Sequence, residues 1–396
     1  MTRSADTIHT TLSDPKVPVS KPRLPTAQAI MPYLECLDQS RIYSNLGPVS
    51  QQLQKRLGML LGVTEGGLSL TSSGSTALIG AILARAGRAG TRKPLAICPS
   101  YTFVATVSAI QCCGYTPYLV DVARDSWTPD PEALHTHPRL DEVGLVVITA
   151  PFGRVPDLGA WANFSRDTGV PVVMDAAASF DVLLRSAQDY PPDIPIALSF
   201  HATKAFGCGE GGGVLTSDPE LLERAVRATN NGFYGTRQVT GDNINGKMSE
   251  YHACVAMAAL DDWAAKLWQF QQVASAYHRA AKTNAVTPFL WIGGDVSYAY
   301  SLFESATPAQ AFDLRHRLAN KGIDSRFWYG FGLHAEPGFG PFEADPLPVT
   351  HDLSRRLLGI PYYCDMPKGA TQDICATIAK ATAVSSTTIS RNVAQL

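Results

Sequence analysis

Short apolar runs alternate with longer stretches of helical character between about residue 50 and residue 230, and this alternation limits the possible folds most. Most of the runs are continuously apolar, which is typical of strands that helices cover on both faces. We therefore predict an α/β fold with a mostly parallel sheet. The candidate strands are Leu68–Thr71, Leu95–Cys98, Pro117–Asp121, Leu145–Ala150, Val170–Asp175, Ile196–Phe200 and Gly213–Thr216. Helices are expected between these strands, at Thr76–Ala86 and Val104–Cys113.

A different pattern begins in the C-terminal part of the sequence, with a helix-rich stretch from Ser249 to about Lys282. Beyond Pro288 the expected order is strand, helix, strand and helix, at Val296–Phe303, Pro308–Lys321, Asp324–Tyr329 and about Thr371–Ala383. A chain of 396 residues exceeds what one hydrophobic core usually supports. We predict a loose N-terminal arm over 1–25, a large domain over 26–270 and a smaller α+β domain over 271–396.

Composition excludes several classes of protein. The net charge of −2, from 33 basic and 35 acidic residues, gives no reason to expect a nucleic-acid partner. No apolar run reaches the roughly 18 residues of a membrane-spanning helix, and the first 25 residues lack the apolar core of a signal peptide. Eight cysteines are scattered without CxxC spacing, which is typical of a reduced, intracellular protein. We therefore expect a cytoplasmic protein with no membrane partner and no metal.

Lys204 and Asp175 form the pair of residues that says most about chemistry. Lys204 ends the segment Ser199-Phe200-His201-Ala202-Thr203-Lys204, and Asp175 ends the apolar run that starts at Val170. A lysine amine that forms a Schiff base and a carboxylate that holds a protonated pyridine nitrogen are the groups that a pyridoxal-phosphate (PLP) enzyme needs. Taken singly, Lys204 could be a surface lysine and Asp175 a helix cap or a surface residue.

Two further segments could serve such a cofactor. Ser72-Ser73-Gly74-Ser75-Thr76 follows a strand and opens a helix, so its backbone N–H groups and hydroxyls could bind a phosphate. An ordinary turn with an N-cap is the alternative. Phe103, in Pro99-Ser100-Tyr101-Thr102-Phe103, follows the next strand and could stack on a cofactor ring, although core packing is the default for a single phenylalanine.

A glycine-rich run after Lys204 matches the G-x-G-x-x-G pattern at Gly207, Gly209 and Gly212. A dinucleotide-binding fingerprint follows a strand and opens a helix, whereas this run leads into the candidate strand Gly213–Thr216. We therefore interpret it as a tight reversal that brings backbone close to the active site, and a Rossmann dehydrogenase is disfavoured.

The ordered set of motifs resembles the DegT/DnrJ/EryC1/StrS family of PLP-dependent sugar aminotransferases. The order is phosphate cup, stacking aromatic, aspartate, Ser-Phe-x-x-x-Lys and glycine turn. Further matches extend from Tyr43-Ser44-Asn45-Leu46-Gly47-Pro48 to Leu358-Gly359-Ile360-Pro361, over nearly the whole chain. Asn245-Gly246-Lys247-Met248 resembles the family's Asn-x-Arg/Lys-Met segment. The resemblance implies a fold-type I PLP-transferase that is a homodimer with shared active sites.

The resemblance also assigns roles to individual residues. Lys204 would bind the cofactor covalently and then move protons, and Asp175 would pair with the pyridine nitrogen. Phe103 would stack on the ring. The phosphate would be held by Gly74, Ser75 and Ser199, with Asn245 reaching across from a second subunit.

One position departs from the family pattern. The family usually has Asp-x-Ala-Gln or Asp-x-Ala-His, in which the last residue contacts the ring hydroxyl or the substrate. This chain has Asp175-Ala176-Ala177-Ala178, and Ala178 offers no polar atom. His201 and Tyr101 are the nearest candidates by sequence to occupy that volume. That contact is therefore not transferred to this chain.

From the resemblance we expect an aminotransferase that moves an amino group from glutamate to a nucleotide-linked keto-sugar. A related PLP-dependent sugar 3-dehydratase carries histidine at the lysine position, so Lys204 argues against it. Two alternatives stay open: an aminotransferase for a cyclitol or another non-nucleotide ketone, and a non-catalytic binding or regulatory protein with the same fold.

Overall fold

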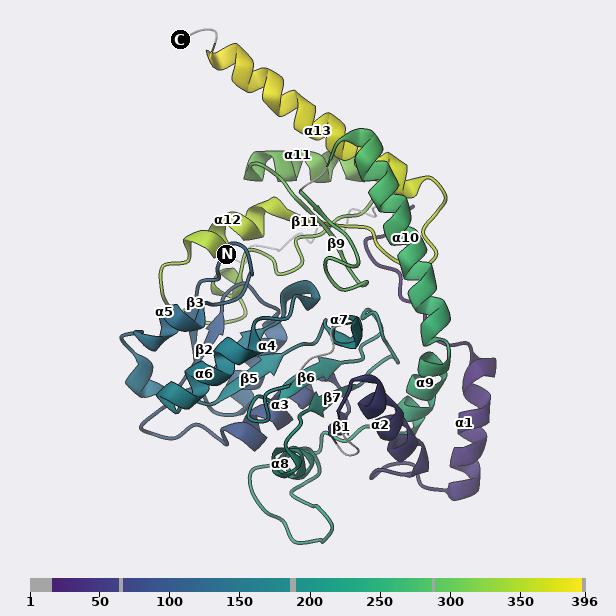
Figure 1. The fold of residues 1–396 in the computed structure, drawn as a ribbon, viewed down its shortest axis with the longest axis vertical. Coiled ribbons are helices and arrows are strands. Elements are labelled where there is room, and N and C mark those ends of the chain that lie inside the picture. Colours follow the sequence, from purple (N-terminus) through teal and green to yellow (C-terminus); the bar gives the residue numbers. More distant parts are fainter. Residues whose placement is uncertain (1–15, 64–66, 186–189, 287–288, 394–396) are drawn as a thin grey trace, which may run out of the picture.

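A computed structural model describes residues 16–63, 67–185, 190–286 and 289–393. Its centre is an eight-stranded sheet with the order β1-β7-β6-β5-β4-β2-β3-β10. A second, three-stranded antiparallel sheet has the order β11-β9-β8. Figure 1 shows the two sheets in separate parts of the molecule, with the long helix α10 (Trp263–Asn284) beside the small sheet. The prediction of an α/β protein with a mostly parallel sheet and a smaller α+β part is confirmed.

Five of the seven pairings in the large sheet are parallel, and β7 is antiparallel to both of its neighbours. The large-sheet strands are β1 Leu68–Thr71, β2 Leu95–Pro99, β3 Thr116–Val120, β4 Val143–Thr149, β5 Val172–Asp175, β6 Ile196–Ser199, β7 Gly212–Leu215 and β10 Glu343–Ala344. The small-sheet strands are β8 Leu290–Trp291, β9 Ser301–Glu304 and β11 Leu357–Ile360.

Helices cover both faces of the large sheet, which explains its continuously apolar strands. Along β4, Val146 and Ile148 belong to one hydrophobic core, whereas Leu145 and Val147 belong to a second core on the opposite face. All four side chains are fully buried. The helices of the N-terminal part are α1 Ala27–Ser40, α2 Pro48–Leu60, α3 Gly74–Arg85, α4 Val104–Cys112, α5 Pro131–His135, α6 Leu158–Thr168, α7 Phe180–Arg185 and α8 Pro219–Thr229.

The C-terminal part begins with a long helical stretch, as the sequence predicts. It consists of α9 (Glu250–Asp261), which Ser249 caps as expected, and α10. The later helices are α11 Pro308–Ala319, α12 Pro348–Arg356 and α13 Ala370–Val393. Helix α10 continues through residue 270, so the domain limits 26–270 and 271–396 stay predictions.

Two predicted strands of the C-terminal part differ from the structure. The segment Asp324–Tyr329 forms a single bridge, between Arg326 and Gly359, because the chain then turns at Phe327–Gly330. The predicted strand Val296–Phe303 is confirmed only near its end, in β9. Its first residues are diverted because Ser297 and the Tyr298 N–H donate hydrogen bonds to the buried Asp181 carboxylate.

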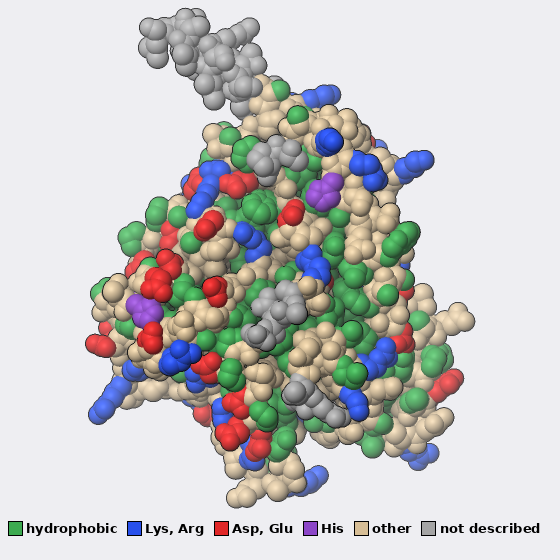
Figure 2. All heavy atoms as spheres, in the orientation of Figure 1, with side chains coloured by type: hydrophobic (Ala, Val, Ile, Leu, Met, Phe, Trp, Pro, Cys, Tyr) green, Lys and Arg blue, Asp and Glu red, His purple; other side chains and the backbone are tan. Residues whose placement is uncertain are grey.

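The described part of the N-terminal arm is packed against the protein. The Val17 N–H donates to the Gly322 carbonyl, and Val19 is buried. Residues 1–15 of the predicted arm lie outside the described residues. Among the helices that the structure describes, none is both long enough and apolar enough to cross a membrane. On the face drawn in Figure 2, acidic and basic side chains are interspersed.

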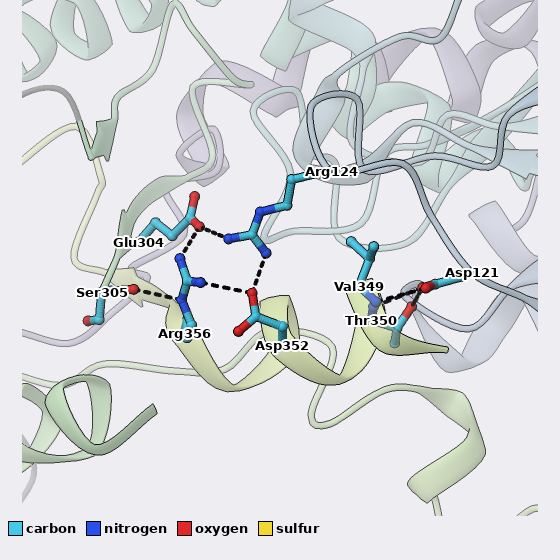
Figure 3. A network of polar contacts seen from close by, with 8 residues as sticks. All are labelled: Asp121, Arg124, Glu304, Ser305, Val349, Thr350, Asp352 and Arg356. Atoms are coloured by element: carbon cyan, nitrogen blue, oxygen red, sulfur yellow. Dashed lines mark hydrogen bonds and ion pairs between the residues drawn. The ribbon is translucent and has the colours of Figure 1, made fainter. Parts of the chain in front are cut away.

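A network of charged side chains joins the loop after β3 to the small sheet and α12 (Figure 3). Arg124 pairs with Glu304 at 2.6 Å and also with Asp352, and Arg356 pairs with the same two carboxylates at 2.6 and 2.8 Å. Beside it, Asp121 accepts hydrogen bonds from the first turn of α12. These contacts fix the position of the small sheet relative to the carboxyl edge of the large one.

Candidate active site

The carboxyl ends of the parallel strands bring several predicted site residues to one edge of the large sheet. Asp175 ends β5 and pairs in register with Thr149, the last residue of β4. Ser199 ends β6, and Lys204 follows it in the adjoining loop. Ligands of open α/β sheets bind at this edge, so the geometry agrees with the sequence prediction of where the site lies.

The Asp175 carboxylate is held by two hydrogen bonds. The Thr106 hydroxyl of α4 donates to Oδ2 at 2.8 Å, and the Ala177 N–H donates to Oδ1 at 3.1 Å. Burial nevertheless raises the pKa of Asp175, although both hydrogen bonds and the positive charge of Lys204 act in the opposite direction. A carboxylate in this position therefore favours a cationic partner, such as a protonated ring nitrogen.

The N-terminus of α3 has the chemistry of a phosphate cup. Ser73 and Thr76 form a capping box that uses their own N–H groups. The N–H groups of Gly74 and Ser75 have no acceptor among the residues that the structure describes. A Cβ atom at Gly74 would lie 2.6 Å from the Ser199 Cβ, so only glycine lets the helix start approach Ser199 this closely. Gly74 and Ser199, two of the predicted phosphate-binding residues, therefore lie against each other, and Ser75 is the residue after Gly74.

Lys204 lies on a loop that the glycine-rich run folds back. The loop is closed by backbone hydrogen bonds from Phe200 to Gly211, from Ala202 to Gly209 and from Cys208 to Phe200. The run then enters β7 antiparallel to β6, so the predicted tight reversal is confirmed. The Lys204 amine donates to the Tyr300 hydroxyl at 3.4 Å, which places a residue of the C-terminal part beside it.

Phe103 lies at the N-cap of α4 and is 56% exposed. Its carbonyl accepts a hydrogen bond from the Thr106 N–H at 3.1 Å, which joins it to the first turn of the helix that carries Thr106. Phe103 is therefore not packed in the core, which was the alternative in the sequence analysis. An exposed ring close to the Thr106–Asp175 pair is available for stacking on a planar ligand.

Asn245 is separate from this group within the chain. It is exposed, and its side-chain oxygen accepts a hydrogen bond from Lys247 at 2.8 Å. The next residue, Gly246, accepts from the Ser72 N–H at 2.7 Å. The segment therefore borders the phosphate cup, but none of the described hydrogen bonds joins Asn245 to Gly74, Ser75 or Ser199.

Gly153 lies close to the carbonyl of Ala178, where the chain departs from the family pattern, and the preceding residue Phe152 belongs to a cluster of aromatic side chains. Tyr329 stacks on Phe152 at 4.6 Å, and its hydroxyl accepts from the Phe152 N–H. Tyr101, one of the two residues considered for this volume, packs edge-on against Tyr329 at 5.2 Å. The other, His201, is directed at Thr203, with Nδ1 2.8 Å from its hydroxyl, so it does not take the place of the missing side chain.

Three residues of the site, Thr106, Tyr300 and Tyr329, were not predicted from the sequence. Thr106 had a detectable signal, since it lies one helical turn after Phe103 in a predicted helix. Tyr300 and Tyr329 had none, because they are remote in sequence from Lys204 and Asp175 and belong to aromatic-rich segments of the C-terminal part. Only the folded chain brings them to the sheet edge.

The residues at this edge fit PLP. An unpaired pair of helix N-terminal amides beside a serine hydroxyl suits its phosphate, and the buried Asp175 carboxylate suits its ring nitrogen. The exposed Phe103 ring suits its flat face, and the Lys204 amine suits its aldehyde.

Comparison with known proteins agrees with this geometry. Residues 26–379 match the DegT/DnrJ/EryC1/StrS aminotransferase family. Protein Rv3402c of Mycobacterium tuberculosis is 27% identical, over 92% of this chain and 89% of its own length. The dTDP-4-amino-4,6-dideoxy-D-glucose transaminase of Shigella dysenteriae is 28% identical, over 91% and 97%. The crystal structure of DesI in the presence of its TDP-sugar product superimposes with a TM-score of 0.78 at 26% identity, over 96% of each chain.

Proposed function

The chain belongs to the DegT/DnrJ/EryC1/StrS aminotransferase family, and on that basis we propose that it transfers an amino group from glutamate to a nucleotide-linked keto-sugar. It is a PLP-dependent aminotransferase with the fold-type I architecture of its relatives. The observation that carries the proposal is the convergence of Lys204, Asp175 and the open N-terminus of α3 at one edge of the sheet.

Each residue at this edge would hold one part of the cofactor. Asp175 would accept a hydrogen bond from the ring nitrogen, with its orientation set by Thr106. Gly74, Ser75 and Ser199 would bind the phosphate, and Phe103 would cover one face of the ring. PLP, when bound, supplies a ring that takes up the electron pair released at the substrate carbon.

Lys204 would carry out the proton transfers. Its Nζ would take a proton from the carbon that bears the amino group and return one during the second half of the reaction. The Tyr300 hydroxyl, 3.4 Å away, accepts a hydrogen bond from this amine and would orient it between those steps.

A homodimer with shared sites is part of the proposal. Asn45, Tyr234, Arg237 and Lys247 line a surface cavity of about 480 Å³ that adjoins the Asn245 segment. Tyr43, also on this part of the chain, is 45% exposed although its ring stacks on Tyr251. A polar, partly cationic cavity beside exposed aromatic rings is consistent with a surface that completes the partner's site with Asn245.

A cytoplasmic location is proposed as well. All eight cysteines of the chain are free. Five of them are buried, and burial raises the pKa of these thiols to about 12 or about 11, which makes them unreactive. A reducing compartment suits a chain with this many unpaired thiols.

The acceptor of the amino group is, in this proposal, a nucleotide-linked keto-sugar. The relatives named for dTDP-linked sugars support a nucleotide-linked ketone as its class. Incubating the purified holoenzyme with glutamate and a panel of nucleotide-linked keto-sugars, followed by mass spectrometry, tests it directly. Conversion of a keto-sugar to its amine is the expected result. Amination of a free cyclitol ketone alone, or of no ketone, would contradict it.

A further inference from the structure

Lys266 is a buried lysine without a carboxylate partner. It lies in the second turn of α10, and only 7% of its surface is accessible. Its nearest aromatic ring, Phe270, lies 5.9 Å away on the same helix. Among the described residues, no ion pair or hydrogen bond links its ammonium group to an acidic side chain. Burying an unpaired ammonium group costs free energy, which a bound anion would offset.

The side chain of Lys266 lines a cavity that also reaches Lys204. Three segments form the rest of the wall: the N-terminal stretch Ser20–Arg23, the loop Ala202–Lys204 and the stretch Tyr362–Cys364. The cavity has a volume of about 20 Å³, which exceeds the roughly 10–15 Å³ that one water molecule requires. The space therefore admits a group of about the size of one water molecule or one end of a carboxylate.

The charge around this cavity is predominantly positive. Lys21, Arg23, Lys204 and Lys266 line it. Asp365 pairs with Lys21 at 2.6 Å, and Asp262 pairs with Arg23. These two carboxylates pair with two of the four cations, and Lys204 interacts electrostatically with the buried Asp175. Lys266 is the cation of this lining that forms no ion pair with a carboxylate in the described part of the chain, and its charge favours an anion in the cavity.

The pKa of Lys266 is consistent with a group that lacks a counter-ion. Burial lowers the pKa most, and Arg23 lowers it further, whereas Cys364 and Asp262 raise it. A bound anion would oppose the effect of burial by favouring the charged ammonium form.

We propose that this cavity binds the carboxylate group of a small carboxylic acid, with Lys266 and Arg23 as its cationic walls and Lys204 beside it. The flat end of a carboxylate suits the narrow space, whereas a phosphate group with several terminal oxygens needs more room. The carboxylate belongs either to the amino-acid donor or its keto-acid product, or to a separate small acid that binds next to Lys204. The first source rests on the proposed function.

The test measures binding of acetate to the PLP-loaded enzyme and does not depend on its activity. Thermal unfolding is followed while acetate replaces chloride at constant ionic strength, for the wild type, Lys266→Met and Lys282→Met. Lys282 is the matched control, because it lies on the same helix but is exposed. Acetate should raise the melting temperature of the wild type and of Lys282→Met. In Lys266→Met the half-saturating concentration should rise by roughly tenfold or more.

The same response to acetate in all three proteins, or a response to chloride that acetate does not reproduce, would overturn the proposal. Lys266→Met should fold, because an apolar side chain of similar length replaces an unpaired buried charge. Lys266→Gln is a second variant that keeps a polar end, and it should lose the acetate response as well.

Steady-state kinetics then distinguishes the two sources. If the carboxylate belongs to the donor, acetate competes with glutamate, and Lys266→Met raises KM for glutamate roughly tenfold with little change in kcat. If a separate acid binds, the variant loses the acetate response while KM for glutamate stays unchanged. Failure of the enzyme to aminate any nucleotide-linked sugar would overturn the proposed function and leave the acetate measurement intact.

Discussion

The Thr106 hydroxyl donates a 2.8 Å hydrogen bond to Oδ2 of Asp175. This bond links the start of α4 to the end of β5, so the helix that presents Phe103 also orients the carboxylate. One element therefore sets both the stacking ring and the group that would hold the ring nitrogen. The Ala177 N–H holds the other carboxylate oxygen at 3.1 Å.

Substitution of Asp175 by asparagine tests the role of its charge. Asp175→Asn keeps the shape and one acceptor oxygen but cannot keep a ring nitrogen protonated. We expect the half-reaction with glutamate to slow by several orders of magnitude in stopped-flow absorbance, while some cofactor stays bound through the phosphate cup. Asp181→Asn, at another buried carboxylate, is the control and should leave that rate nearly unchanged. A near-normal rate in Asp175→Asn would show that the carboxylate does something else.

Covalent attachment of the cofactor at Lys204 is a second prediction. The protein should purify yellow, and borohydride should fix the cofactor to the amine with which it reacts. Peptide mapping by mass spectrometry should then find the label on Lys204. Lys247 is the informative comparison, because it is the lysine of the Asn-x-Lys-Met segment and burial lowers its pKa. A label on Lys247 instead would refute the assignment.

The strands of the large sheet were predictable because burial on both faces imposes continuous apolar runs. The predicted strand Leu145–Ala150, for example, overlaps β4 (Val143–Thr149) over all but its last residue. The segment Asp324–Tyr329 was also predicted as a strand but forms only one bridge, since the turn at Phe327–Gly330 directs Tyr329 toward Phe152. Its apolar side chains satisfy a tertiary contact that no local pattern encodes.

Some residues of the candidate site could likewise be predicted from local sequence, and others could not. Gly74, Asp175 and Ser199 lie at strand ends or helix starts, where local sequence and sheet geometry together indicate a ligand. The contact between Lys204 and Tyr300 joins residues 96 positions apart and has no local signal. The role of Asn245 depends on a second subunit, which a single chain does not supply.

Hybrid dimers test the shared site. An Asn245→Ala chain and a Lys204→Ala chain should each be inactive or weakly active as homodimers. In a hybrid, one site would carry both defects and the other neither, so mixing the unfolded chains and refolding them should restore part of the activity. Native mass spectrometry would verify that hybrids form. If they form and activity does not return, Asn245 acts within its own subunit or has no role in the site.

The raised pKa of Asp175 predicts how pH affects the stability of the cofactor-free protein. The unfolded carboxyl titrates near about 3.9, and burial moves the folded pKa above that value. Between these two values the folded state binds more protons than the unfolded state, so this group makes the protein less stable as pH rises. The free energy of unfolding of the wild type should therefore fall relative to that of Asp175→Asn across this window, as urea unfolding at several pH values would measure. A constant difference would contradict the predicted shift.

The last prediction concerns Ala178, where the chain leaves the family pattern. Ala178 is buried, and its carbonyl oxygen lies 3.0 Å from where a Cβ of Gly153 would be, so Gly153 lets the two backbones approach closely here. Because the glutamate half-reaction does not involve the sugar, effects on cofactor chemistry and on the acceptor can be separated. Ala178→Gln should leave the glutamate step within roughly tenfold, about 1.4 kcal/mol of barrier, and lower kcat/KM for the acceptor by a larger factor. Ala178→Ser adds a polar atom with little volume and is the matched control. Strong acceleration of the glutamate step by Ala178→Gln would mean that the native alanine is a catalytic defect, and a non-catalytic role for the chain would then be favoured.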